Sequence, residues 1–247
     1  MTQKTVAIVT GHTRGLGAAL ADTMLSLDTR VLAISRNRNA ALAARYPDTL
    51  HEIQLDLSDL DALNGWLAQD ILRGFLADAD RVLLVNNAGL LAPVGPLADQ
   101  DAGAIARAVS VNVAAPLMLA AAFAAQSVDI ADRRIAHISS GAARNAYPGW
   151  SIYCATKAAL DHHARAVALD DHAGLRICSV APGVIDTDMQ AEIRSTGLDR
   201  FPMRERFDAL KRDGQLATPE ASAAKLIDYL LSDAFGSAPT ADVRELN

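Results

Sequence analysis

Residues 4–27, KTVAIVTGHTRGLGAALADTMLSL, decide the fold of this chain. Residues 4–10 form a short apolar run typical of a strand that is buried on both faces, and the run ends at Gly11. A glycine-rich turn follows, and then an alanine-rich segment that predicts a helix to about Leu27. Glycines at this point let the backbone approach a pyrophosphate, which the unpaired N–H groups and positive dipole of the helix N-terminus would bind. The alternative is an ordinary strand-to-helix turn.

The same alternation of apolar runs and helical segments continues along the chain. Further strands are predicted at residues 30–35, 51–57, 81–86, 134–139 and 175–180, and an edge strand in residues 239–247. Helices are predicted at residues 58–76 with Ser58 as N-cap, at 101–127, around Tyr153, and from Pro219 with Thr218 as N-cap. This order predicts an α/β fold: one Rossmann-fold domain over residues 1–247, with a doubly wound parallel sheet of about seven strands and helices on both faces.

Composition limits the classes of function. With 51% hydrophobic and 21% charged residues, the 247-residue chain can bury a large core. A net charge of −6 without a basic block argues against nucleic-acid binding. No apolar run reaches transmembrane length and no signal peptide precedes the first strand, so we expect no membrane association. Cys154 and Cys178 lack metal-ligand spacing and are interpreted as reduced thiols of a cytoplasmic protein without a metal.

Tyr153 and Lys157 are the first candidates for chemistry. They lie four residues apart in a predicted helix, so both side chains project from one face. A nearby ammonium favours the phenolate, so we expect a lowered pKa for Tyr153 and a role as acid or base near neutral pH. Ser140, at the end of a predicted strand, could reach the same substrate oxygen. The alternative is a Tyr and a Lys on the solvated face of an amphipathic helix.

The second predicted strand ends in Ser35-Arg36-Asn37. A nicotinamide cofactor without a 2′-phosphate is usually held at this position by an acidic residue on the ribose diol. Here Arg36, together with Arg14 in the glycine-rich turn, could bind a phosphate. The sequence therefore favours NADP(H) over NAD(H), and two solvated arginines are the alternative.

Other predicted strands are also followed by candidate site residues. Asp56 and Leu57 could meet an adenine ring, and Asn87, Ala88 and Gly89 form a loop suited to lie against a cofactor. Asn112 lies in an apolar helix and therefore needs hydrogen-bond partners. It is either a satisfied packing residue or part of a proton relay.

Residues 186–214 carry mixed charge, show no clear strand, and follow the C-terminal end of a strand, where ligands bind in open α/β sheets. We interpret this segment as a substrate lid with hinges near Gly197 and Gly214. The predicted helices at 101–127 and around Tyr153 carry little charge, which predicts that both are covered in a homodimer; a tetramer built on it stays open.

Five motifs, in order, resemble those of the short-chain dehydrogenase/reductase family. They are the TGxxxGxG turn from Thr10, the NNAG loop from Asn86, Ser140, Tyr153-x-x-x-Lys157, and the PG turn at Pro182. The resemblance runs from Thr5 to about Leu231. Within the family the chain is most similar to sepiapterin reductases and bacterial benzil-type diketone reductases, on Gly149-Trp150 and DTDMQ at residues 186–190 among others. It implies an NADPH-dependent reductase of a small ketone or α-dicarbonyl.

The resemblance also implies roles for individual residues. Tyr153 would donate the proton, Ser140 would hydrogen-bond the developing alkoxide, and Lys157 would bind the nicotinamide ribose and lower the pKa of Tyr153. Asn112 would hold a water of the proton relay. Ser139 is the rival of Ser140, but the family's spacing to the tyrosine favours Ser140. Cofactor contacts are implied for Gly11, Thr13, Arg14, Gly15, Leu16, Gly17, Ser35, Arg36, Asp56, Leu57, Asn87, Ala88, Gly89, Tyr153, Lys157, Pro182, Gly183, Val184, Thr187 and Met189. Substrate contacts are implied for Ser140, Trp150, Tyr153 and Asp242, the last as the counterpart of an acidic residue that anchors the pterin in sepiapterin reductases.

Two other functions stay open. A general 3-oxoacyl or alcohol reductase of the same family would need a basic patch to dock an acyl-carrier protein. The predicted lid offers Arg194, Arg200, Arg204, Arg206, Lys211 and Arg212 for such a patch. The other is a binding protein that holds NADPH without turnover, against which the intact Ser140, Tyr153 and Lys157 argue.

Overall fold

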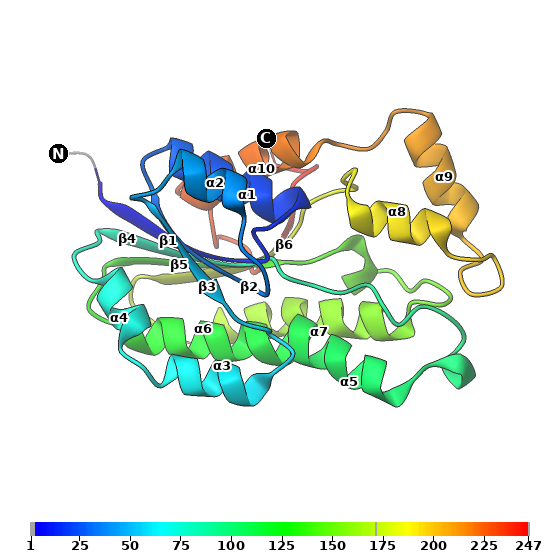
Figure 1. The fold of residues 1–247 in the computed structure, drawn as a ribbon, viewed down its shortest axis with the longest axis horizontal. Coiled ribbons are helices and arrows are strands. Elements are labelled where there is room, and N and C mark those ends of the chain that lie inside the picture. Colours follow the sequence, from blue (N-terminus) through cyan, green and yellow to red (C-terminus); the bar gives the residue numbers. More distant parts are fainter. Residues whose placement is uncertain (1–2, 171, 247) are drawn as a thin grey trace.

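In the computed structural model, which describes residues 3–170 and 172–246, seven parallel strands form one sheet (Figure 1). The strands are β1 (Thr5–Thr10), β2 (Arg30–Ser35), β3 (Leu50–Gln54), β4 (Arg81–Asn86), β5 (Asp132–Ile138), β6 (Leu175–Ala181) and β7 (Thr240–Asp242). Their order in the sheet is β3-β2-β1-β4-β5-β6-β7, with every neighbouring pair parallel. The strand order reverses between β1 and β4, and ligands of such sheets bind beyond the carboxyl ends at this point. The predicted doubly wound fold is confirmed.

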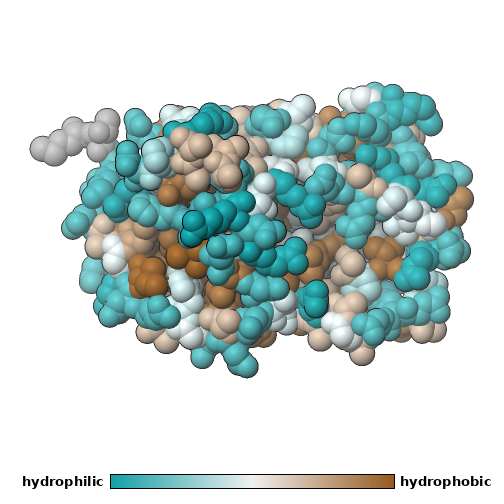
Figure 2. Space-filling view, in the orientation of Figure 1, coloured by the Kyte–Doolittle hydropathy of each residue, from teal (hydrophilic) through white to brown (hydrophobic). Residues whose placement is uncertain are grey.

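Helices cover both faces of the sheet (Figure 1). One layer holds α1 (Gly15–Ser26), α2 (Ala40–Arg45) and α10 (Pro219–Leu231); the other holds α3 (Leu60–Leu67), α4 (Ile71–Leu76), α5 (Ala102–Val109), α6 (Ala115–Gln126) and α7 (Ser151–Val167). Successive strand residues point to opposite faces and so feed two cores. On β1, Ala7 and Val9 pack with α1 and α10, whereas Val6 and Ile8 pack with the opposite layer. On the face drawn in Figure 2 hydrophilic residues predominate, and apolar residues form separate patches between them.

The predicted helix at residues 58–76 is two short helices, α3 and α4, separated at residues 68–70. The N-cap of α3 is Asp59, whose carboxylate accepts a hydrogen bond from the N–H of Ala62 at 2.9 Å. The prediction of Ser58 as N-cap is wrong. Ser58 donates both its N–H and its hydroxyl to the carboxylate of Asp56, two residues earlier, and this local bond replaces capping. At α10, by contrast, Thr218 caps the helix as predicted.

The predicted helix at 101–127 is interrupted as well. A π-helical turn, η2 (Ser110–Ala114), joins α5 to α6. Pro116 has no N–H and cannot donate the usual hydrogen bond to the carbonyl of Asn112, four residues earlier, so the regular α-helical ladder breaks at this point.

Residues 102–126, taken as one helical stretch, have the length and apolar composition of a membrane span. The expectation that no apolar run reaches that length is therefore wrong. In this fold the stretch packs as a core helix: Leu119, Ala120 and Phe123 are buried against the sheet with α3 and α4.

Several strand ends differ from the predicted ones. β3 ends at Gln54, so Asp56 and Leu57 lie in the loop beyond it, and β5 runs two residues further toward the N-terminus, to Asp132. The predicted edge strand in residues 239–247 is the short β7, and Asn247 lies outside the described residues.

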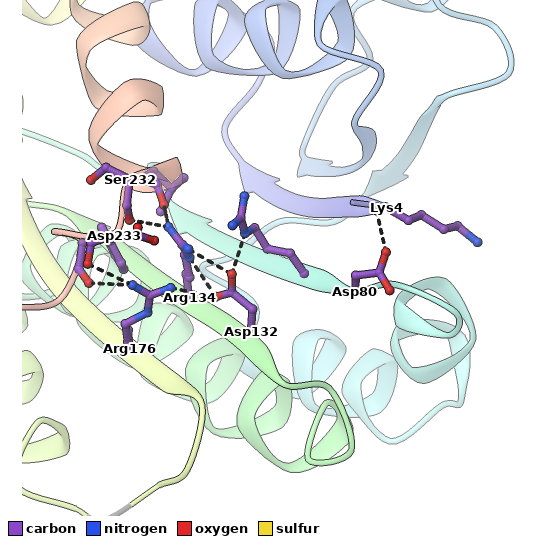
Figure 3. A network of polar contacts seen from close by, with 10 residues as sticks. Lys4, Asp80, Asp132, Arg134, Arg176, Ser232 and Asp233 are labelled. Atoms are coloured by element: carbon purple, nitrogen blue, oxygen red, sulfur yellow. Dashed lines mark hydrogen bonds and ion pairs between the residues drawn. The ribbon is translucent and has the colours of Figure 1, made fainter. Parts of the chain in front are cut away.

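Asp132 ties together the amino ends of three strands. Its carboxylate accepts from Arg81 on β4 at 2.6 Å, from Arg134 on its own strand at 2.8 Å, and from Arg176 on β6 at 3.0 Å. Arg134 is only 1% exposed and also donates to the carbonyls of Leu230 and Ser232 at the end of α10. Figure 3 shows Arg134 and Arg176 converging on Asp132. The sheet and the last helix are therefore joined through one carboxylate.

Replacing Asp132 with Asn should lower the free energy of unfolding by about 3–5 kcal/mol, because Arg134 would keep a buried, unbalanced charge. Burial alone would raise the pKa of Asp132, but the bonds from Arg134, Arg81 and Arg176 outweigh it and hold the pKa far below its usual range. The stabilisation is therefore present above about pH 4 and lost as the pH falls toward the folded-state pKa. Urea unfolding between pH 7 and pH 2 should show that the difference in free energy of unfolding between the wild type and Asp132→Asn disappears as the pH falls. Asp80→Asn is the matched control, since Asp80 is exposed and, within residues 3–170 and 172–246, its carboxylate accepts from the N–H of Lys4 alone. Equal losses in both variants would contradict the role of Asp132.

Candidate active site

One cavity of about 690 Å³ runs across the carboxyl ends of the strands. Every residue predicted to contact the cofactor lines it, from Gly11 in the glycine-rich turn to Met189 in α8 (Asp188–Ser195). Ser140 and Trp150, predicted for the substrate, line it as well. Asn112 and Asp242 are not among the lining residues that the structure describes.

The glycine-rich turn lets a ligand group approach its backbone, because glycine occupies its tightest positions. A Cβ on Gly17 would lie 2.1 Å from the carbonyl oxygen of Gly11 and 2.4 Å from the Asn87 amide nitrogen, so only glycine fits. Gly11 and Gly15 have φ angles of 75° and 53°, which other residues rarely adopt. Thr10 fixes the facing loop, because its hydroxyl accepts from the N–H groups of Asn87 and Ala88. The turn and the start of α1 therefore fit a pyrophosphate.

At the end of β2, Ser35 and Arg36 line the same cavity, and Arg36 is exposed. Arg14 is less available than the sequence suggests. Its guanidinium forms an ion pair of 2.8 Å with Asp188 at the start of α8, across the mouth of the cavity. Arg36 is thus the cation best placed for a phosphate on the adenosine ribose.

Ser140, Tyr153 and Lys157 meet in the middle of the cavity. Tyr153 and Lys157 lie on successive turns of α7, and the Lys157 ammonium is 5.8 Å from the centre of the Tyr153 ring. The ammonium donates to the carbonyl of Ile138, the last residue of β5, at 2.8 Å. Ser140 accepts from the N–H of Ala142 at 3.1 Å and so starts a short 3₁₀ turn, η3 (Gly141–Ala143).

Ser139 and Ser140, the two candidates for the serine of the site, differ in their side-chain partners. The Ser139 hydroxyl is 2.6 Å from a carboxylate oxygen of Asp161 and is buried in that contact. Ser140 instead lines the cavity, and its hydroxyl lies near enough to Tyr153 to act on the pKa of the phenol. Geometry therefore favours Ser140, as the spacing did.

The expected lowering of the Tyr153 pKa is wrong for this structure. Burial raises the pKa of Tyr153 to about 12, and the nearby hydroxyl of Ser140 opposes this only in part. Burial also lowers the pKa of Lys157 to about 8. Sequence spacing placed the two side chains on one helix face but carried no information about how deeply that face is buried. At neutral pH Tyr153 is therefore a phenol, able to donate a proton.

Asn112 is a satisfied polar residue. Its side chain accepts from the N–H of Leu90 at 2.7 Å and donates to the Leu90 carbonyl at 2.8 Å and to the Thr156 hydroxyl at 3.1 Å. These bonds hold the loop after β4 against α7. The packing role of Asn112 is thus present.

The other half of the cavity is apolar and aromatic. Trp150 stacks flat on Phe201 with ring centres 4.6 Å apart, and its edge-on contact with Tyr153 places it beside the candidate acid. Phe207 on α9 (Arg204–Arg212) packs on both rings. Sequence reasoning did not assign several lining residues of this half: Leu91, Tyr147, Ile193, Arg206, Phe207, Leu210 and Arg244. The aromatic residues of the lid were the available signal, since a solvated lid would not need them.

Asp242 is not a free anchor for a substrate. It is 3% exposed, and its carboxylate binds the guanidinium of Arg244 twice, at 2.6 and 2.9 Å. Arg244, not Asp242, lines the cavity and lies over Gly183 in the PG turn. The prediction of Asp242 in the substrate site is therefore wrong for this structure: its partner two residues later could not be read from spacing.

The comparisons with known proteins agree with this geometry. The family model described as short chain dehydrogenase matches residues 5–197, so the chain belongs to the short-chain dehydrogenase family of oxidoreductases. A benzil reductase ((S)-benzoin forming) of Bacillus cereus is 35% identical over 92% of this chain and 94% of its own length. Sepiapterin reductase of Bos taurus is 31% identical over 95% and 92%. Among solved structures, a short-chain dehydrogenase/reductase from Burkholderia vietnamiensis is 53% identical with a TM-score of 0.73 over both whole chains.

Proposed function

We propose that this protein is an NADPH-dependent carbonyl reductase that acts on small, apolar α-dicarbonyl compounds. The observation that carries the proposal is the position of Ser140, Tyr153 and Lys157, between a glycine-lined half of one cavity and an aromatic half. The names of the relatives, benzil reductase and sepiapterin reductase, support the same class of substrate.

The bound cofactor would supply a hydride to the carbonyl carbon. Tyr153, protonated at neutral pH, would donate its proton to the carbonyl oxygen, and Ser140 would stabilise the developing negative charge by hydrogen bonding. Lys157 would stabilise the phenolate that remains and bind the nicotinamide ribose. Thr187, whose methyl group lies 3.3 Å from the position of a Cβ on Gly15, would close the cofactor site from the lid side.

The aromatic half favours a diketone over a pterin. Trp150 and Phe207 line the cavity and offer ring surfaces for an apolar substrate, and the carboxylate that would anchor a pterin is paired with Arg244. The rival 3-oxoacyl function has less support, because most basic residues of the lid have local partners. Lys211 and Arg194 pair with Asp186, Arg204 pairs with Asp208, and Arg212 pairs with Asp213.

The first test is oxidation of NADPH, followed at 340 nm, with benzil, a simple diketone, sepiapterin and a 3-oxoacyl thioester. We expect turnover of the diketones, with sepiapterin slower. Tyr153→Phe should lower kcat by about 10²–10⁴-fold, the usual contribution of a positioned acid, while NADPH affinity changes by no more than a few-fold. Turnover of the thioester alone would replace the proposal with its rival, and cofactor-dependent stabilisation without any turnover would indicate a binding protein.

The preference for NADPH is proposed from Arg36. Because a charge-assisted hydrogen bond contributes about 1.5–3 kcal/mol, Arg36→Ala should weaken NADPH binding about 10- to 100-fold and leave NADH binding nearly unchanged. Dissociation constants from cofactor fluorescence would measure this. Arg45→Ala is a control, since Arg45 on α2 pairs with Asp22 away from the cavity. Equal losses for both cofactors would reject recognition of a 2′-phosphate.

We also propose a homodimer, in a cytoplasmic protein. The exposed positions of α5, α6 and α7 include apolar and small residues: Val109 is 43% exposed, and Ala121 and Ala158 are exposed as well. Sedimentation should give twice the 26.1 kDa chain mass. Ala121→Arg on α6 should shift the protein toward monomer, whereas Leu97→Arg, at a 73% exposed position outside these helices, should not. A wild-type monomer would refute the proposal.

A further inference from the structure

We propose that Asp161 is a positioning residue for the site, whose buried carboxylate keeps the Lys157 ammonium charged and fixes the segment that carries Ser140. The inference rests on the proposed function, because it assigns Asp161 its role through the side chains that would carry out proton transfer.

Asp161 lies one helical turn after Lys157 on α7, and both side chains are almost completely buried. Residues four apart on a helix have Cβ atoms about 5–6 Å from each other, on the same face. A buried ammonium loses hydration and tends to lose its proton. The Asp161 carboxylate acts against that tendency and raises the pKa of Lys157, which burial has lowered.

The same carboxylate fixes the strand ends beside the site. One of its oxygens accepts from the hydroxyl of Ser139 at 2.6 Å and from that of Ser179 at 2.7 Å. Ser139 directly follows β5 and precedes Ser140, and Ser179 lies on the neighbouring β6. Asp161 therefore connects α7, which carries Tyr153, to the segment that carries Ser140.

The second oxygen of Asp161 faces Arg144, at 3.5 Å from its Nε. Arg144 also donates to the carbonyl of Ala241 in β7 at 2.9 Å, and its side chain is 33% exposed. This cation offsets part of the field of Asp161 at Lys157. Arg144 is not among the cavity-lining residues that the structure describes, so its effect on the site would act through Asp161.

The other titratable groups around this cluster are neutral near pH 7. On β6 and α10, burial raises the pKa of Cys178 to about 11 and that of Tyr229 to about 12. On β5, burial lowers the pKa of His137 to about 3.

Beyond Arg144 lie Asp242, the last residue of β7, and Arg244, two residues after it, which balance each other in a bidentate ion pair. Asp161 and Arg144 are therefore the charges whose removal should be felt at Lys157. Removing the Asp161 carboxylate should lower the pKa of Lys157, and removing the Arg144 guanidinium should raise it.

The test is an NMR titration of ¹³C-labelled lysine, which is tractable because the chain has four lysines: Lys4, Lys157, Lys211 and Lys225. Loss of one signal in Lys157→Met assigns the resonance. Asp161→Asn, which keeps the size of the side chain, should lower the pKa of Lys157 by about one pH unit or more. Arg144→Gln should raise it. Asp132→Asn is the matched control: it removes a partly buried carboxylate at the opposite ends of the strands and should leave the pKa of Lys157 unchanged.

The opposite signs separate an electrostatic role from a structural one. If Asp161→Asn leaves Lys157 unchanged, or if Arg144→Gln shifts it in the same direction as Asp161→Asn, the inference is overturned. A shift of the same size in Asp132→Asn would also overturn it, since destabilisation would then explain the effect. If Asp161→Asn does not fold, Arg144→Gln, at a partly exposed residue, still shows whether the pKa of Lys157 rises.

Turnover adds a second readout. In the pH profile of kcat for reduction, the fall on the alkaline side should begin about one unit lower in Asp161→Asn than in the wild type. A profile that merely drops at every pH would argue against the role. The titration of Lys157 does not need turnover, so a wild type that reduces none of the carbonyl compounds would reject the proposed function and leave the titration to decide the inference.

Discussion

The structure depends on one close approach of backbone to backbone. Gly17, in the first turn of α1, lies so near the Gly11 carbonyl and the Asn87 amide that no side chain fits between them. This contact brings the start of α1 against the ends of β1 and β4, and β1 and β4 are where the strand order reverses. Thr10 then fixes the loop after β4 through two backbone N–H groups. The cavity, and the N-terminus of α1 that faces it, follow from this arrangement.

Burial is the second constraint, and it acts on the chemistry. The sheet is covered on both faces, and Tyr153 and Lys157 on α7 are almost completely buried although they line the cavity. Burial favours the neutral form of each group, which makes the phenol a ready donor but weakens the ammonium that must stabilise its conjugate base. A protein that needs both states has to supply a compensating charge nearby. Asp161 lies on the same helix face, one turn further on.

The sequence was sufficient to predict the features that recur along the chain, the strands and their turns. It was insufficient for features that depend on contacts between particular side chains. Apolar runs and turn glycines predicted the strands and the sheet, because period and order determine which strand ends meet. Most of the predicted cavity-lining residues came instead from the resemblance to the family. Ser58 failed as a cap because Asp56 captured its hydroxyl, and the helix at 101–127 broke because Pro116 follows Asn112 by four residues. The second failure was readable in principle, since a proline inside an apolar helix removes a known hydrogen bond. The first was not.

Asp242 shows most clearly that a residue's role cannot be carried over from a relative by sequence position alone. An acidic residue near the C-terminus can bind a substrate only if its carboxylate faces the cavity without a partner, and here Arg244 takes both oxygens. What the cavity meets is a guanidinium lying over Gly183, a hydrogen-bond donor where a carboxylate would be an acceptor. A heterocycle that offers N–H donors loses its partner at this position, whereas a carbonyl oxygen gains one. The exchange of an acceptor for a donor, two residues apart in the sequence, is therefore an argument for the proposed diketone substrate over a pterin.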